Sequence, residues 1–399
     1  MPASTVELNA SDRFRKLLRD PVLLISLIIL WSLLSLFILV PLIWLFMRTF
    51  EEGGRFTLAN IISILADPNQ RQALWNSLLL GSLVGLCGTV LGFLFAFTAV
   101  RTNLSKAWIL FLDCAIILPL ISPPFTTAIA MIFSFGPRGL ITYDLLGIKN
   151  FTAYGLHSTL FSETITYFPI AYLTLKAIIA GIDPNIEDMA FSLGSSRWRV
   201  FWTVTLPLTV PGLANSFLLL FAASLADFAT PLILAGNSFP VLPTQAYLQI
   251  TGLFDMKGGA VLSFLLLIPA FLVFFLQRFW VSRKYYVTIS GKVGAKTQIK
   301  SVLPWAKYFL LGLCLFISAF ILYFYVLLFY ASIVHAFGAN FQLTWKHYGL
   351  SLPKVLRPSE IHSSSLGLEC RSEGFMASSW VILSPRRSSL PVKPWRSFQ

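Results

Sequence analysis

The sequence predicts an all-α, polytopic membrane protein, and three observations support this prediction. Of its 399 residues, 56% are hydrophobic and only 12% are charged, whereas soluble globular proteins carry roughly 25% charged residues. This composition excludes a typical soluble enzyme and a disordered or collagen-like chain. Uncharged apolar runs recur along the chain, and several reach the roughly 20 residues that a membrane-crossing helix needs. The basic residues that produce a formal net charge of +13 lie mostly between these runs.

The apolar runs define the expected elements in chain order. The first run, residues 22–47, follows a basic N-terminal segment, residues 1–21. It is longer than a signal-peptide core, and no small-residue cleavage site follows it, so we expect an uncleaved first span. The further expected spans are residues 75–100, 107–135, 155–182, 212–235, 259–280 and 304–334.

The third expected span contains Pro119, Pro123 and Pro124. Proline removes a backbone donor and clashes with the preceding helical turn. We therefore expect a broken or kinked helix, which a membrane protein tolerates where neighbouring groups satisfy the freed backbone atoms.

The loops indicate the orientation of the chain. The N-terminus, the 101–106 turn, the 183–211 loop and the 278–307 segment carry 15 Lys and Arg, whereas the opposite loops carry 6. The positive-inside rule places the first set in the cytoplasm. Because membrane orientation accounts for the basic excess, we expect no nucleic-acid partner.

A weak internal repeat suggests a second half of the fold. The stretch PLIWLFMRTF at Pro41–Phe50, followed by FTLAN, aligns without a gap with VLLFYASIVH at Val326–His335, followed by FQLTW. In the first copy a second span follows, but residues 351–399 contain no apolar window of 18 residues. We expect residues 304–350 to begin a second half that truncation or a shifted reading frame has removed. The alternative is that residues 351–399 are a genuine disordered extension.

The polar stretch after the fourth span predicts a helical hairpin on the cytoplasmic side. Gly194 can form the turn, Arg197 and Arg199 are expected to point outward, and Pro207 is expected to end the second helix. The apolar residues that could line one side are Ala190, Leu193, Trp198, Phe201 and Val204. Such a loop is too apolar to remain free in solution, which suggests a docking element.

This stretch resembles the EAA loop of ABC importer permeases. The family pattern is Glu-Ala-Ala, three residues, Gly, nine residues, then Ile-x-Leu-Pro. In this chain Asp188 stands at the Glu position, Met189 and Ala190 at the Ala positions, and Gly194 at the Gly position; Val204, Thr205, Leu206 and Pro207 follow at the required spacing.

The resemblance implies that the 183–211 loop couples the membrane helices to a cytoplasmic ABC ATPase dimer. The ATPase hydrolyses ATP on a separate subunit, so the chain itself is expected to be no enzyme. The implied coupling residues are Glu187, Asp188, Ala190, Gly194, Arg197, Val204, Leu206 and Pro207. The alternative is an ordinary amphipathic loop.

Further stretches resemble the fused, two-half permeases of ferric-iron importers: residues 118–125, 224–234, 242–252 and 283–292. Those proteins have twelve spans in two halves, each with its own EAA loop, whereas this chain has one such loop. The resemblance implies a six-helix permease half over residues 22–280, a basic cytoplasmic linker over 281–303 and the first helix of a second half. It also implies a bacterial inner-membrane location and a separate extracytoplasmic substrate-binding protein.

Four ionisable residues fall inside expected spans: Asp113, Glu163, Lys176 and Asp227. Such residues are expensive in a membrane and usually face the bundle interior or a water path. Asp227 is the leading candidate for the transport pathway, and Asp113 is a further one. For Asp113, Glu163 and Lys176 a structural pair or an interfacial position is favoured.

No cofactor or metal centre is expected. The chain has 4 Cys and 4 His, which are scattered and form no CxxC pair. The stretch GKVGAKT at residues 291–297 lacks the Gly before Lys that a phosphate-binding loop requires.

Three alternatives remain open at this stage. The chain could be an ABC permease for another solute, such as a phosphonate, thiamine, a polyamine or sulfate. It could be a secondary transporter that uses Asp113 or Asp227 as its proton or cation site. It could also be a non-functional truncated permease.

Overall fold

The computed structural model describes residues 21–148, 151–236, 238–281 and 302–356. The predicted N-terminal segment, nearly all of the basic linker and most of the predicted tail lie outside the described residues. The chain divides into two compact units, Met1–Leu328 and Phe329–Gln399.

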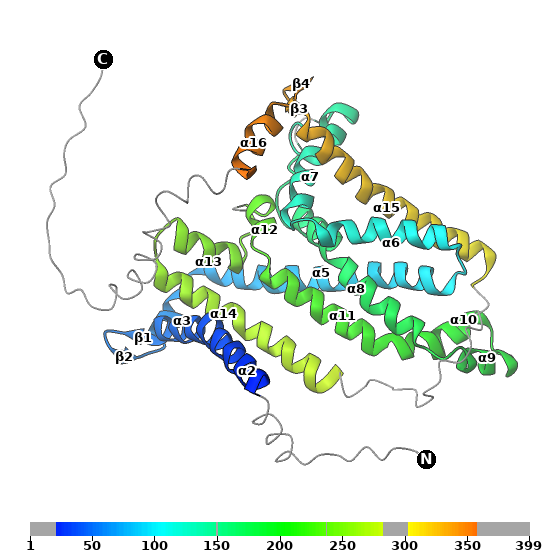
Figure 1. Ribbon diagram of the computed structural model, residues 1–399, viewed down its shortest axis with the longest axis horizontal. Coiled ribbons are helices and arrows are strands. Elements are labelled where there is room, and N and C mark those ends of the chain that lie inside the picture. Colours follow the sequence, from blue (N-terminus) through cyan, green and yellow to red (C-terminus); the bar gives the residue numbers. More distant parts are fainter. Residues whose placement is uncertain (1–20, 149–150, 237, 282–301, 357–399) are drawn as a thin grey trace, which may run out of the picture. The chain divides into compact units, whose positions relative to one another are not determined.

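The first unit is helical apart from one short strand hairpin, as Figure 1 shows, and the label η marks a π-helical segment. Its elements before the predicted cytoplasmic loop at residues 183–211 are α2 (Pro21–Leu34), η1 (Ser35–Leu39), α3 (Val40–Phe50), β1 (Glu51–Glu52), β2 (Arg55–Phe56), α4 (Ala59–Ala66), α5 (Pro68–Arg101), α6 (Lys106–Ile121), α7 (Phe125–Phe135), η2 (Leu140–Leu145) and α8 (Leu156–Ala180). The remaining elements are α9 (Pro184–Ser192), α10 (Arg197–Val200), η3 (Phe201–Thr205), α11 (Leu206–Ala226), α12 (Ala229–Leu234), α13 (Leu242–Thr251), α14 (Met256–Phe275), η4 (Leu276–Val281) and most of α15 (Pro304–Ser332).

The lengths and apolar character of these helices match a polytopic membrane protein. Within the described residues, 5 helices could cross a membrane, or up to 7 if each of two bent helix pairs is one span. The larger figure equals the number of spans expected from the sequence. The unbroken candidates are Pro21–Phe50, Pro68–Arg101, Arg197–Ala226, Met256–Phe279 and Pro304–Ser332.

The prolines of the third span break the helix, as predicted. α6 ends at Ile121 and the chain resumes as α7 at Phe125, with a bend of 103° between the two parts of the span. Pro123 and Pro124 occupy the gap, where two missing backbone donors would otherwise interrupt the helical ladder.

The bounds expected for the fifth span are wrong. A continuous helix runs from Arg197 to Ala226 through α10, η3 and α11, and it ends before Asp227. Pro207 therefore does not end the second helix of the hairpin; it is the second residue of α11. The π-helical turn just before it changes the local hydrogen-bond register, and such turns accommodate an irregularity without ending a helix.

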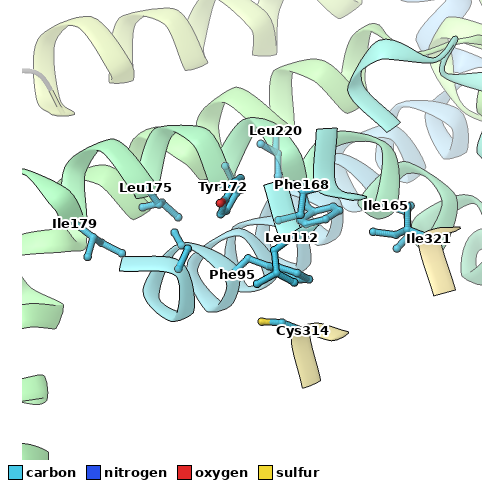
Figure 2. Packing of buried hydrophobic residues seen from close by; sticks show 14 of the residues in the cluster. Phe95, Leu112, Ile165, Phe168, Tyr172, Leu175, Ile179, Leu220, Cys314 and Ile321 are labelled. Carbon is cyan, nitrogen blue, oxygen red and sulfur yellow. The ribbon is translucent and has the colours of Figure 1, made fainter. Parts of the chain in front are cut away.

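The core lies where α5, α8 and α11 pack against one another (Figure 1). Figure 2 shows the central cluster, in which Phe95 of α5, Phe168 and Tyr172 of α8 and Leu220 of α11 are fully buried. A Cβ atom on Gly92 of α5 would lie 2.6 Å from the Ala171 Cβ of α8, so only glycine allows this close approach.

The N-terminal helix presents its apolar surface outward. The most apolar window of Pro21–Phe50 has no buried residue, and its C-terminal part, α3, packs on α14 through the rings of Phe46, Phe50 and Phe264. An exposed helix that carries no charge over residues 22–47 suits a lipid environment.

The second unit contains the end of α15, the antiparallel strands β3 (Val334–Ala336) and β4 (Asn340–Leu343), and α16 (Lys346–Leu356). The Ser332 and Tyr348 hydroxyls lie 2.7 Å apart and join α15 to α16. The expected start of the tail at residue 351 falls inside α16, so residues 351–356 are helical; residues 357–399 lie outside the described part of the chain.

Candidate functional site

The predicted cytoplasmic loop forms a compact helical hairpin. Asp183 caps α9 by accepting a hydrogen bond from the Asn185 backbone N–H at 2.9 Å. Gly194 has a φ of +81°, and Ser196 caps α10 by accepting from the Arg199 backbone N–H at 3.3 Å. The left-handed φ favours glycine at position 194, because a side chain there would strain the backbone.

A buried ion pair joins the hairpin to the membrane helices. Glu187 of α9 faces Arg101, the last residue of α5, with Nη2 3.1 Å from Oε1 and Nη1 donating to Oε2 at 3.2 Å. The Thr205 hydroxyl of η3 donates to Oε1 of the same carboxylate at 2.7 Å. Both charged side chains are almost completely buried. The Glu187 carboxylate therefore links α5, α9 and η3, and removing one partner would leave an uncompensated buried charge.

Sequence spacing did not distinguish the two acidic residues of the loop. Asp188 stands at the motif's Glu position, but its side chain is exposed, whereas Glu187 is the carboxylate that binds Arg101. No sequence pattern paired Arg101 with this loop, because the two residues are 86 positions apart. The position of Arg101 at the end of an apolar run was the only feature of the sequence that could have suggested a role for this residue at the base of the loop.

The hairpin also carries an exposed apolar surface, the hairpin patch, formed by Met189, Leu193, Trp198 and Trp202. Leu193 is 86% exposed and Trp198 is 71% exposed. Both belong to the apolar residues that were predicted to line one side of the hairpin. α9 ends at Ser192, so Leu193 belongs to the turn, and the short α10 buries Val200 instead. Exposed apolar surface of this kind marks interaction sites.

The other predicted coupling residues occupy both sides of the hairpin. Ala190, Val204 and Leu206 are half-buried, whereas Arg197 and Pro207 are exposed. The Trp198 ring contacts the rings of Phe201 and Trp202, with centroids 6.0 and 5.6 Å apart.

Asp113 has an ion-pair partner. The Lys176 ammonium group of α8 lies 2.7 Å from its Oδ1, and the Tyr172 hydroxyl donates to the same oxygen. The pair joins α6 to α8 and is about one-quarter to one-third exposed, with side-chain values of 26% for Asp113 and 30% for Lys176. Since its charge is already neutralised, Asp113 is a weaker candidate for contact with a transported solute than the sequence indicated.

Asp227 and Glu163 lie together in the protein interior. Asp227 occupies the break between α11 and α12, where its Oδ1 accepts from the backbone N–H groups of Ala229 and Thr230 at 3.0 and 3.2 Å. Glu163 of α8 accepts a hydrogen bond from the Ser224 hydroxyl and has no exposed surface. α8 turns Glu163 toward α11, and its interfacial position near the start of the span stays a prediction.

Within the described residues, no group of three or more His, Cys, Asp or Glu could hold a metal ion. Cys87, Cys114 and Cys314 are free thiols. Cys370 and the GKVGAKT stretch lie outside the described part of the chain.

Comparisons with known proteins agree on a transport component. Residues 88–285 match the family described as binding-protein-dependent transport system inner membrane component. The chain is 31% identical over 336 residues to the ferric transport system permease protein FbpB of Actinobacillus pleuropneumoniae, covering 83% of this chain and 48% of that protein. It is 32% identical over 227 residues to the molybdenum transport system permease protein ModB of Escherichia coli K12, covering 55% of this chain and 96% of that protein.

Among solved structures, a bacterial ABC transporter involved in the import of the acidic polysaccharide alginate aligns with a TM-score of 0.59 and 18% identity, covering 68% of this chain and 98% of that one. This likeness shows a shared fold. The chain spans about half the length of the curated ferric relatives that it matches.

Proposed function

Because this chain belongs to the family of binding-protein-dependent transport system inner membrane components, we propose that it is the translocation subunit of an ATP-driven importer. A separate ATPase dimer would dock on the hairpin, and an extracytoplasmic binding protein would deliver the substrate. The N-terminus and the hairpin would lie in the cytoplasm, as the distribution of basic residues indicates.

The observation that carries this proposal is the construction of the hairpin. Its outer surface exposes the hairpin patch, which has the apolar character of a protein-docking surface. Its inner surface is tied to α5 through the buried pair of Glu187 and Arg101. A docked partner that moves the hairpin would therefore pull on α5, which packs on α8 and α11 in the centre of the unit.

The coupling role extends to the residues of the motif. Gly194 supplies the left-handed turn that separates α9 from α10, and Leu206 begins the helix that leads into the membrane core. Asp188 is exposed beside the hairpin patch and is available to a basic group on the ATPase. The proposed coupling set is Glu187, Asp188, Ala190, Gly194, Arg197, Val204, Leu206 and Pro207.

We propose ferric iron as the substrate. The ferric permease of A. pleuropneumoniae matches across 83% of this chain, whereas the molybdenum permease of E. coli matches across 55%. Among the intramembrane acids, Asp227 is the proposed pathway residue, and its position at a helix break is typical of transporter binding sites.

The docking proposal is tested by capture of the cognate ATPase on the full chain in lipid nanodiscs. Leu193→Asp and Trp198→Asp place charge on the hairpin patch, and both should abolish capture and ATP-dependent uptake into proteoliposomes. Leu145→Asp is the matched control, since Leu145 is 75% exposed on a different segment. If the two hairpin variants capture the ATPase as well as Leu145→Asp does, the coupling role is wrong.

Uptake itself separates the proposal from a secondary transporter. Under the proposal, transport requires ATP and survives collapse of the ion gradient. Transport that persists without ATP and stops when the gradient collapses would contradict it.

A further inference from the structure

The buried acids Glu163 and Asp227 lack the partners that buried carboxylates usually have. Glu163 Oε1 and Asp227 Oδ2 are both inaccessible to solvent, and neither accepts a well-formed hydrogen bond among the described residues, although the Tyr167 hydroxyl faces the Asp227 carboxylate. The Glu163 side chain has no exposed surface at all, and Asp227 is 6% exposed. Buried carboxylate oxygens are normally satisfied, so each of these two requires an explanation.

The two acids form one cluster. The Ser224 hydroxyl donates to Glu163, while the Ser224 carbonyl accepts the backbone N–H of Asp227 at 3.2 Å. The two carboxylates are close enough for their charges to interact, and Tyr167 lies beside both. Tyr167 is one helical turn from Glu163 on the same face of α8, which explains this grouping.

Among the residues that the structure describes, no positive side chain offsets this cluster. The ion pairs of Arg101 with Glu187 and of Lys176 with Asp113 lie elsewhere. Two adjacent carboxylates cannot both remain ionised in a low-dielectric interior unless a positive charge joins them. In the arrangement that the structure shows, a proton shared by the carboxylates would meet this need.

The donor atoms also favour one class of ligand. The groups around the unpartnered oxygens are two carboxylates, a phenol and a hydroxyl, all of which are oxygen donors. Oxygen donors suit hard cations, and a tyrosine oxygen is an established ligand of haem iron. Oxyanions such as sulfate or a phosphonate would be repelled by the same carboxylates.

The backbone at this point supports a ligand site. The helix is interrupted between Ala226 and Ala229, and Asp227 occupies the interruption. Transporters place substrate and ion sites at discontinuous helices, because irregular backbone at membrane depth is tolerated where it is buried in protein or lines a cavity.

We propose that Glu163, Asp227 and Tyr167 form a transient binding site for a hard trivalent cation on the transport path. This inference rests on the proposed function, in which the cation is the ferric ion being imported. When the helices open, the cation enters between the carboxylates and binds the Tyr167 oxygen as a phenolate. The proton held by the carboxylates and the phenol proton of Tyr167 both leave to water.

The test is ferric-ion binding by the full chain in lipid nanodiscs, with the ion supplied as its nitrilotriacetate chelate and with no ATPase present. Retained iron is measured by elemental analysis after free chelate is removed, and visible absorption reports an iron–phenolate charge-transfer band. The parent chain should retain about one ion, since one cluster of two carboxylates and a phenol suits a single hard cation, and it should show the band.

Three variants and one control define the site. Glu163→Gln and Asp227→Asn should each weaken binding by at least about 10–100-fold, the range seen on loss of a group that supports a metal ligand. Tyr167→Phe should abolish the absorption band. Glu52→Gln, which changes an exposed acid outside the cluster, should leave binding and the band unchanged.

Several results would overturn the proposal. These are a parent chain that retains no iron, a band that persists in Tyr167→Phe, or a Glu52→Gln variant that loses as much binding as Glu163→Gln. Thermal unfolding of each variant shows whether it is folded, and Tyr167→Phe decides the matter if the acid variants do not fold. A chain that captures the ATPase but binds no ferric ion would refute this inference and leave the proposed coupling role intact.

Discussion

Two buried acidic sites in this protein differ in how their charge is compensated. At the base of the hairpin, Glu187 has a guanidinium and a hydroxyl as partners, and it joins three elements. At the break between α11 and α12, Glu163 and Asp227 each leave one oxygen without a partner. A fully partnered buried acid stabilises one arrangement of the helices, whereas an unpartnered pair remains available to a proton or a cation.

The largest expected effect is at the partnered site. Arg101→Ala should lower the free energy of unfolding by about 3–5 kcal/mol, because it leaves the Glu187 carboxylate buried without a counter-charge. Thermal unfolding of the chain in nanodiscs measures the change. The double variant Arg101→Met with Glu187→Met should recover most of the loss, since neither charge is then buried. A loss below about 1 kcal/mol for Arg101→Ala would show that the pair is not structural.

A substitution in the turn of the hairpin tests whether the position of α9 depends on the conformation of Gly194 as well as on the Glu187–Arg101 ion pair. Gly194→Ala should destabilise the hairpin by about 1–2 kcal/mol, the cost of a left-handed conformation for a residue with a Cβ atom. A Cβ there would meet no other atom within 4 Å, so packing does not contribute. Hydrogen exchange of α9 and α10 reports the local effect.

Gly312→Ala is the control for this prediction. Gly312 lies inside α15, and a Cβ there also meets nothing within 4 Å. Alanine is favoured over glycine in a helix interior, so this variant should be neutral or slightly stabilising. Equal exchange rates in the two variants would contradict a specific need for glycine at position 194.

The unpartnered site should respond in the opposite direction to the partnered one. Glu163→Gln should raise the free energy of unfolding by about 1 kcal/mol, because the amide oxygen can still accept from Ser224 and folding no longer has to keep a proton on one of two adjacent buried carboxylates. Glu187→Gln is the matched variant and should destabilise the chain. Parallel thermal unfolding curves measure both, and changes of the same sign in the two variants would remove the distinction between the sites.

The smallest effect is expected at the partly exposed ion pair of Asp113 and Lys176. Asp113→Asn removes one partner of a partly exposed ion pair, so the free energy of unfolding should fall by less than about 1 kcal/mol. Repeating the unfolding measurement at high salt should reduce the difference from the parent chain further. A loss as large as that of Arg101→Ala would mean that exposure does not decide the strength of these pairs.

Much of the fold could be predicted from local patterns. Long uncharged runs predict spans because a helix must cross roughly 30 Å of hydrocarbon, and the clustered prolines predict the break between α6 and α7 because they remove consecutive backbone donors. The Gly194 turn is likewise local. The continuation of the helix through Pro207 could not be predicted, because it depends on the π-helical turn that precedes it.

The candidate sites were harder to predict, since side-chain burial depends on which helices become neighbours. The motif spacing located the loop but favoured Asp188, whereas the contact with Arg101 belongs to Glu187. Glu163 lies near the start of its helix, as expected, but its burial beside Asp227 depends on the packing of α8 on α11 and could not be predicted.

The sequence by itself determined the membrane-spanning class, the approximate spans and the loop that bears the coupling motif, because these follow from the length and polarity of local segments. The tertiary structure alone decided which acids are paired and which are not. Arg101 and Glu187 are 86 residues apart and Ser224 and Glu163 are 61 apart, so only helix packing brings them within hydrogen-bonding distance and sets the charge of each site.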